Sequence, residues 1–281
     1  MINDKKMVSG KTLLLALILL TPMFLVSPVI AGNDDLNDKE LGVEYNCDYA
    51  PPWADANNCD DNALGFYNWL GSHGFTKQWN NGDTNASERH FEMWGVNGTD
   101  YDWVDNVDFV YFAGHGTTDG LIFRSDTDGD GYDTQIAHYN EMYLGDTDLE
   151  WLFAMACDVL YRDWWWWTPV RWQAVFNDLH GITGYASTAY DYATTGEAFA
   201  KYLTGDMGES VKCIGDAWKA ATILTQEMPD VVGAVYCICD VDPGSGSIVL
   251  NYYDEYVPGY GNGMYNDPSE VVFSRQWYYE T

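Results

Sequence analysis

Apolar and polar residues alternate along the chain in blocks that predict strands and helices in turn. Short segments rich in β-branched and aromatic residues are typical of strands, and they lie at 41–45, 75–79, 107–112, 149–156, 182–186 and 232–239. Apolar residues at helical spacing predict helices between them, at 61–73, 170–180, 196–203 and 211–226, with a helical turn or two at 87–94. Strands that alternate with helices favour a doubly wound α/β fold, with a mostly parallel sheet and helices on both faces.

The first 31 residues follow a different pattern. Three lysines precede an apolar run at 12–30, which ends at Ala31 and Gly32. This order is typical of a secretory signal peptide that is cleaved after a small residue. An uncleaved N-terminal anchor is the alternative, because the apolar run nearly reaches the length that spans a bilayer. We therefore expect a protein that is secreted or held at an extracytoplasmic surface.

The rest of the chain has no internal repeat and no linker-like stretch. We expect a flexible leader at 32–40 and a single α/β domain at 41–281, with a C-terminal extension after about residue 240.

Composition narrows the possible partners. The 281 residues include 43 acidic and 13 basic side chains, which gives a net charge of −30. A protein this acidic does not attract nucleic acid or an anionic membrane by charge, so we expect neither partner beyond the signal segment. A well-solvated surface explains the acidity, and attraction of cationic substrates or Ca²⁺ is the alternative.

Two residues of chemical interest follow the most apolar predicted strands. His115 follows the strand at 107–112, and Cys157 follows the run at 149–156. Active groups of doubly wound sheets gather where parallel strands end, and a thiol beside an imidazole is the pair that nucleophilic cysteine catalysis needs. Gly116 would let a substrate approach the backbone, and its N–H could face a developing oxyanion. The alternative is an ordinary turn and a small core cysteine.

These segments resemble the caspase–gingipain–legumain superfamily of cysteine peptidases (clan CD). The likeness lies in Val107–Gly116, which ends Ala-Gly-His-Gly, and in Leu149–Cys157, which ends Ala-Cys. The strand at 181–187 and the helices at 196–203 and 214–221 are similar to those that follow the nucleophile in the gingipain-like and CHAT-type branches.

A closer likeness is to exported proteins of the DUF6345 type within that superfamily. It covers about residues 41–240 and is carried by Gly82-Asp83, Glu88, Phe91, Ala113–Gly116, Asp148–Trp151, Ala156-Cys157 and Leu179–Gly181. The resemblance implies a caspase-like fold in which His115 is the general base and acid and Cys157 is the nucleophile. It also implies an oxyanion hole made by the N–H groups of Gly116 and Cys157.

The function expected from this resemblance is an exported cysteine endopeptidase that acts on a protein or peptide substrate. The alternative is a non-catalytic secreted or surface binding protein that keeps the caspase-like fold. In that case Cys157 would be buried or disulfide-bonded.

The six cysteines bear on the same choice, because export favours disulfides. Cys47 and Cys59 can close a short loop beside the first strand. Cys213 could pair with Cys237 or Cys239, which share one face of a strand.

An acidic segment predicts a structural Ca²⁺ site. Carboxylates at alternating positions with a glycine at the sixth match the first half of a Ca²⁺-binding loop, and they are Asp126, Asp128, Asp130 and Asp133. The twelfth position is Ala137 rather than a glutamate, so the pattern is incomplete. The alternative is an acidic hairpin tip between the segments 121–124 and 135–139.

A second His-Gly pair, at His180 and Gly181, precedes its predicted strand instead of following it. This places it at the opposite end of the sheet from His115. We interpret His180 as a histidine at the end of a helix.

Overall fold

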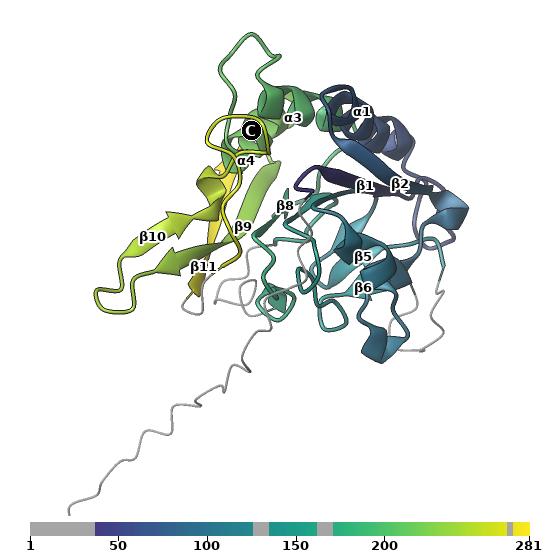
Figure 1. Ribbon diagram of the computed structural model, residues 1–281. Coiled ribbons are helices and arrows are strands. Elements are labelled where there is room, and N and C mark those ends of the chain that lie inside the picture. The colour runs from purple at the N-terminus through teal and green to yellow at the C-terminus, as the bar shows by residue number, and fades with distance from the viewer. Residues whose placement is uncertain (1–36, 126–134, 162–170, 269–271) are drawn as a thin grey trace, which may run out of the picture.

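The structure is a computed structural model that describes residues 37–125, 135–161, 171–268 and 272–281, and an eight-stranded sheet forms its centre (Figure 1). The parallel part of this sheet contains β2 (Thr76–Gly82), β1 (Glu40–Tyr45), β3 (Phe109–Ala113), β7 (Trp151–Met155) and β8 (Gly181–Tyr185). The antiparallel part contains β9 (Val232–Val241), β10 (Ile248–Asn251) and β11 (Val272–Glu280). The expected mixed α/β fold with a mostly parallel sheet is therefore confirmed.

The strand order is β10-β9-β8-β7-β3-β1-β2, and β11 also pairs with β9. The chain runs from β1 outward to β2, and then returns to β3 and continues to β7 and β8 on the other side. The order therefore reverses between β1 and β3, and doubly wound folds bind ligands outside the carboxyl ends of the strands at such a point. Residues after about 240 add β10 and β11 to the same sheet.

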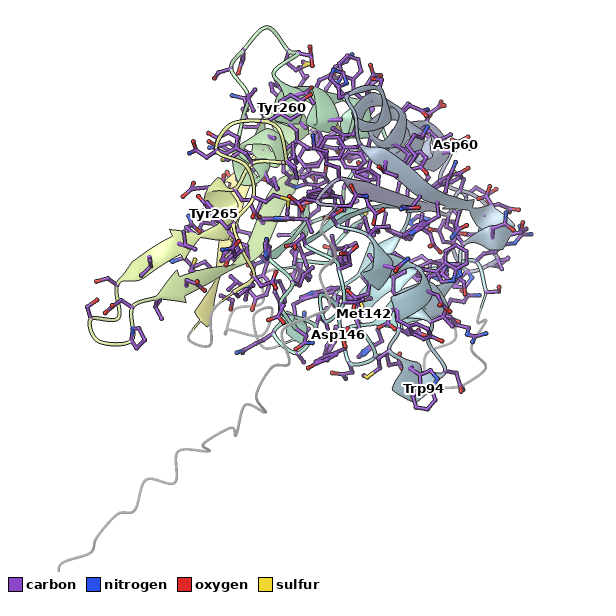
Figure 2. All side chains as sticks on the ribbon, viewed as in Figure 1. Asp60, Trp94, Met142, Asp146, Tyr260 and Tyr265 are labelled. Atoms are coloured by element: carbon purple, nitrogen blue, oxygen red, sulfur yellow. The ribbon has the colours of Figure 1, made fainter. Side chains whose placement is uncertain are left out.

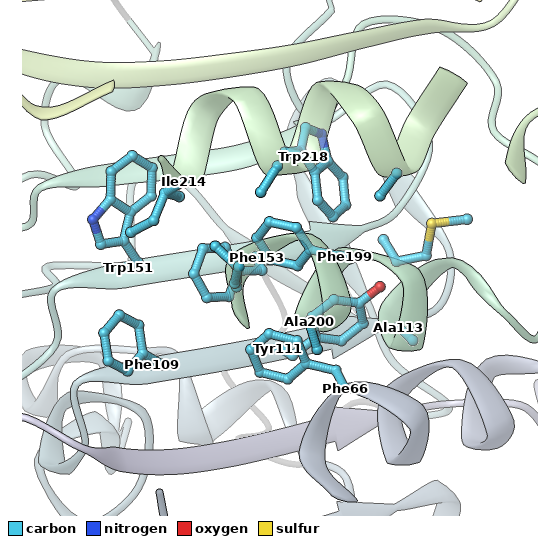
Figure 3. Close-up of a cluster of buried hydrophobic side chains, with 14 of the residues drawn as sticks. Phe66, Phe109, Tyr111, Ala113, Trp151, Phe153, Phe199, Ala200, Ile214 and Trp218 are labelled. Atoms are coloured by element: carbon cyan, nitrogen blue, oxygen red, sulfur yellow. The ribbon is translucent and has the colours of Figure 1, made fainter. Parts of the chain in front are cut away.

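Three α-helices pack on one face of the sheet, namely α1 (Cys59–Ser72), α3 (Thr195–Thr204) and α4 (Ile214–Thr225). Figure 3 shows their aromatic side chains packed against those of β3 and β7. Phe153 on β7 lies with its ring centroid 5.5 Å from that of Phe66 on α1 and 4.9 Å from that of Phe199 on α3. Because side chains alternate between the faces of a strand, the neighbouring Leu152 and Ala154 belong to the second core on the opposite face.

On the second face, the described helical residues are Arg171 and Trp172, and Trp172 belongs to the second core. The other described residues that cover this face include a small antiparallel sheet and 3-10 turns between β2 and β3. The small sheet contains β4 (Gly116–Thr117), β5 (Gly120–Ile122) and β6 (Ile136–His138). The turns are η1 (Asp83–Asn85), η2 (Glu88–His90), η3 (Trp94–Val96), η4 (Asp100–Asp102) and η5 (Val104–Asn106), and a further turn, η6 (Tyr252–Asp254), follows β10. Asp, Asn and Gly recur at short intervals between 82 and 106, and such residues favour turns over a continuous helix.

The helix predicted at 170–180 is wrong for its described residues after Trp172. Phe176 forms an isolated bridge with Leu144, and the Asn177 N–H donates to the Leu144 carbonyl at 2.9 Å. Asp178 adopts a positive φ of 74°. These long-range backbone contacts replace the hydrogen bonds of a helix.

Within the described ranges, no helix is long and apolar enough to cross a membrane. The predicted signal peptide and most of the predicted leader lie outside those ranges.

Candidate functional site

The backbone brings His115 and Cys157 to neighbouring strand ends. Strands β3 and β7 pair in parallel with Ala113 opposite Met155, and each candidate lies two residues beyond that pair. A Cβ atom built on Gly116 would lie 2.6 Å from the Cys157 carbonyl oxygen. The two turns are therefore in direct contact at the carboxyl edge of the sheet.

The His115 imidazole is held by the segment that follows β1. Its Nε2 lies 2.7 Å from the Ala54 carbonyl oxygen, and its ring centroid lies 4.6 Å from that of Tyr49 and 5.5 Å from that of Trp53. A carbonyl oxygen only accepts hydrogen bonds, so Nε2 carries the proton in this contact. Neutral imidazole then has its free electron pair on Nδ1.

Tyr49 fixes the turn that carries His115. Its hydroxyl accepts a hydrogen bond from the His115 N–H at 2.8 Å and donates to the Ile122 carbonyl at 3.1 Å. Burial is the main cause that raises the pKa of Tyr49, so the phenol remains neutral and able to donate.

No pattern in the sequence pointed to this segment at 49–54. Its place follows only from the folded chain, in which the strand order reverses between β1 and β3 and loops after these strands line the crevice at that edge.

Cys157 has partners of its own on the segment that follows β8. The Ala189 N–H donates to Sγ at 3.2 Å, and the thiol contacts the Ala189 carbonyl at 3.5 Å. Burial raises the pKa of Cys157, and the hydrogen bond from Ala189 opposes this only in part. The thiol is therefore protonated at neutral pH in this arrangement, and its side chain contacts Ala189 while that of His115 contacts Ala54.

A sharp turn follows Cys157. Asp158 has a φ of 58°, in the left-handed region that residues other than glycine rarely adopt. Such backbone conformations occur often at functional sites, where the surrounding structure maintains them.

Asp191 adds a carboxylate close to His115. Its Oδ2 accepts a hydrogen bond from the Asn58 N–H at 2.6 Å, and its carbonyl accepts one from Asn58 Nδ2 at 2.7 Å. Burial raises the pKa of Asp191, whereas the hydrogen bond from Asn58 and attraction to His115 lower it. Asp191 was not predicted either, since nothing near it in the sequence connects it to His115.

The predicted Ca²⁺ ligands Asp126, Asp128, Asp130 and Asp133 lie outside the described residues. The strands that flank them, β5 and β6, do form an antiparallel pair.

The predicted disulfides are absent from the structure, in which all six cysteines are free. The Cys47 thiol lies within hydrogen-bonding reach of Cys59, beside the first strand as expected. Cys237 and Cys239 contact each other. Cys213 immediately precedes α4 and interacts with Asp216 in the first turn of that helix, rather than with either of them.

Comparison with known proteins identifies the family to which the chain belongs. No curated protein matches the chain. The sequence matches the family described as "Domain of unknown function (DUF6345)" over residues 44–280. Since this match covers most of its 281 residues, the chain belongs to the DUF6345 family.

Proposed function

We propose that this protein is an exported cysteine endopeptidase with a caspase-like fold, in which Cys157 is the nucleophile and His115 is the general base and acid. The observation that carries the proposal is the placement of a thiol and an imidazole just beyond two adjacent parallel strands, with Gly116 against the Cys157 backbone. Export is supported by the sequence pattern of residues 1–31.

The proposed reaction begins with transfer of the Cys157 thiol proton to Nδ1 of His115. The thiolate attacks the peptide carbonyl carbon, and the C–N bond breaks as His115 returns the proton to the leaving amine. Water then hydrolyses the thioester, which releases the acid and restores the thiol. The Ala54 carbonyl is the third group that orients the base, because it holds the imidazole through Nε2.

This reaction requires the Cys157 thiol to leave Ala189 and turn toward His115. The χ1 angle of Cys157 is the only side-chain torsion that moves Sγ. Rotamer changes of half-buried side chains are fast compared with catalysis. Substrate that displaces the thiol from Ala189 would favour this rotation.

The small sheet supports an oxyanion role for Gly116. The Ile122 N–H donates to the His115 carbonyl at 3.0 Å, which makes Gly116 and Leu121 a pair that exchanges no hydrogen bonds. Strand β5 therefore does not use the Gly116 N–H, and a developing oxyanion could accept from it.

The test is the rate of iodoacetamide alkylation of Cys157 between pH 5.5 and 8.5, measured by peptide mass mapping. We expect His115→Ala to slow labelling at pH 6 by about tenfold or more, because an imidazole partner favours the reactive thiolate. His73→Ala, at the end of α1, is the matched control and should leave the rate unchanged. Cleavage of a peptide library by the wild type, but not by Cys157→Ser, would then identify substrates.

A non-catalytic binding protein is the second candidate, and the raised pKa of Cys157 together with its contacts to Ala189 favours it. Equal labelling rates in the wild type and in His115→Ala, with no cleavage of the library, would support this candidate and contradict the peptidase.

A further inference from the structure

The opposite edge of the sheet carries a second cluster of ionisable side chains. Glu150 immediately precedes β7, and His180 immediately precedes β8. These strands pair in parallel with Trp151 opposite Gly181, so the two residues lie side by side at the amino ends. The segment between β10 and β11 adds Asp267 and Glu255.

Three side-chain atoms converge at this edge. Glu150 Oε2 lies 2.7 Å from His180 Nε2, and Asp267 Oδ1 lies 4.0 Å from the same nitrogen. All three atoms lie within 4.8 Å of one another. His180 is fully buried and Glu150 is 8% exposed, whereas the Asp267 side chain is 34% exposed and leaves the cluster open to water on one side.

Two of these atoms are each other's ion-pair partner. Glu150 Oε2 and His180 Nε2 form a buried ion pair at 2.7 Å, and no further described group donates a hydrogen bond to either atom or accepts one from it. Both atoms also lie within 4.8 Å of the Asp267 carboxylate.

Glu255 fixes the other side of the imidazole. His180 Nδ1 lies 3.1 Å from both of its carboxylate oxygens. Glu255 also accepts hydrogen bonds from Trp151 Nε1 and from the N–H of Tyr265, which is labelled in Figure 2, each at 2.6 Å. A carboxylate held in this way accepts the Nδ1 proton, and a metal ion at Nε2 would replace the proton through which His180 pairs with Glu150.

The charges of these side chains also favour a bound cation. Three carboxyl groups surround one histidine in a largely buried site, and when all three are ionised even a protonated imidazole leaves an excess of negative charge. Uncompensated buried charge is costly, and a divalent cation would balance it. One imidazole with two carboxylates suits Zn²⁺ and similar transition metals, whereas Ca²⁺ and Mg²⁺ prefer all-oxygen sites.

We propose that Glu150, His180 and Asp267 bind a divalent transition metal ion of the Zn²⁺ class, with water as a fourth ligand on the exposed side. Glu255 orients His180 as the outer carboxylate partner that metal-bound histidines usually have. The site is independent of Cys157, which follows the other end of β7, so it neither requires the peptidase proposal nor supports it.

The first experiment measures Zn²⁺ binding to the chelator-treated mature protein by calorimetry and by metal analysis after gel filtration. We expect one bound Zn²⁺ per chain and a rise in Tm when Zn²⁺ is added, because binding to the native state stabilises it. Asp267→Asn should weaken binding by about tenfold or more, the scale of losses at such sites. The substitution affects a partly exposed carboxylate and is therefore compatible with folding.

Asp254→Asn is the matched control, since Asp254 lies on the same segment but outside the cluster, where it accepts a hydrogen bond from Asn251. This control should bind Zn²⁺ like the wild type. The Co²⁺ form should show visible ligand-field bands without thiolate charge-transfer absorption, which distinguishes this site from metal bound at Cys237 and Cys239.

Three results would overturn the proposal. They are the absence of Zn²⁺ binding, equal binding by the wild type and Asp267→Asn, and a thiolate charge-transfer band in the Co²⁺ form. The first would leave His180 as a buried cation paired with Glu150 and Glu255.

Discussion

At the scale of single residues, Gly116 is where the two candidate catalytic turns touch. Alanine at this position would place its Cβ 2.6 Å from the Cys157 carbonyl oxygen and 2.9 Å from the Ala156 Cβ. Because both neighbours belong to the backbone or lie next to it, they cannot move aside without shifting the strand end. We expect Gly116→Ala to lower the free energy of unfolding by about 1–3 kcal/mol, measured by urea denaturation.

The same substitution should also change the reactivity of Cys157, because it separates the turn of His115 from the turn of the thiol. Gly95→Ala is the control, since Gly95 is exposed and its added Cβ would meet no atom closer than 3.9 Å. If both variants unfold at the same urea concentration as the wild type, the contact between the two turns does not contribute to stability.

At the scale of elements, the Asn62 side chain on α1 forms hydrogen bonds to β3 and to α3. Its Oδ1 accepts hydrogen bonds from the Tyr111 hydroxyl of β3 at 2.7 Å and from the Gly196 N–H of α3 at 2.9 Å. Its Nδ2 donates to the Tyr192 carbonyl at 2.8 Å. A single buried side chain on α1 therefore satisfies polar groups on both elements that it packs against.

Asn62→Ala would leave these partners unsatisfied in the core. Each unpaired buried group costs about 1–3 kcal/mol, so we expect a loss of about 3 kcal/mol in the free energy of unfolding, measured by urea denaturation. Asn68→Ala on the exposed side of α1 should cost less than about 1 kcal/mol. A loss of similar size in both variants would mean that helix propensity, and not the hydrogen-bond network, determines the effect.

Patterns of apolar residues predicted most of these elements because a strand and a helix each have their own spacing of apolar residues along the sequence. The strands at 41–45 and 107–112 and the helix at 61–73 recur as β1, β3 and α1, with bounds that differ by a few residues. The turns between 83 and 106, and the contacts of Phe176 with Leu144, depend on tertiary partners that no local window contains.

In the candidate site too, some residues could be predicted from the sequence and others could not. His115 and Cys157 were predictable because strand ends meet at a sheet edge. Ala54 and Asp191 were not, because they reach the site through loops whose paths depend on the folded chain. His180 was misinterpreted as a histidine at a helix end, since the carboxylates around it come from distant parts of the sequence.

At the scale of the whole molecule, buried carboxyl groups make stability depend on pH. Burial is the largest cause that raises the pKa of Asp108 to about 9, the charges of Asp148 and Glu150 raise it further, and a hydrogen bond from the Glu40 N–H opposes the shift. The ordinary value is 3.8, so between about pH 4 and pH 9 the native state keeps a proton that the unfolded chain has lost. Stability from this group therefore falls as pH rises through that window.

Asp108→Asn tests this dependence, because asparagine keeps an oxygen that can accept from Glu40 and cannot ionise. We expect the wild type to lose stability between pH 5 and pH 9, and the variant to lose clearly less, as measured by thermal unfolding across that range. Asp102→Asn, an exposed change, should follow the wild type. Parallel curves for the wild type and Asp108→Asn would show that other carboxyl groups cause the dependence.

The placement of α1, α3 and α4 on a single face has a further consequence for how the molecule opens. Those helices share an aromatic core with the sheet, whereas the described layer on the other face includes short turns and a three-stranded sheet. Segments with few cooperative backbone hydrogen bonds open at a lower cost than packed helices. Amide protons between 83 and 106 would therefore exchange with solvent through local fluctuations, whereas those of the helical layer would exchange only through global unfolding. Gly116 belongs to the more labile layer and Cys157 follows a central strand, so the boundary between the two exchange regimes would pass through the candidate site.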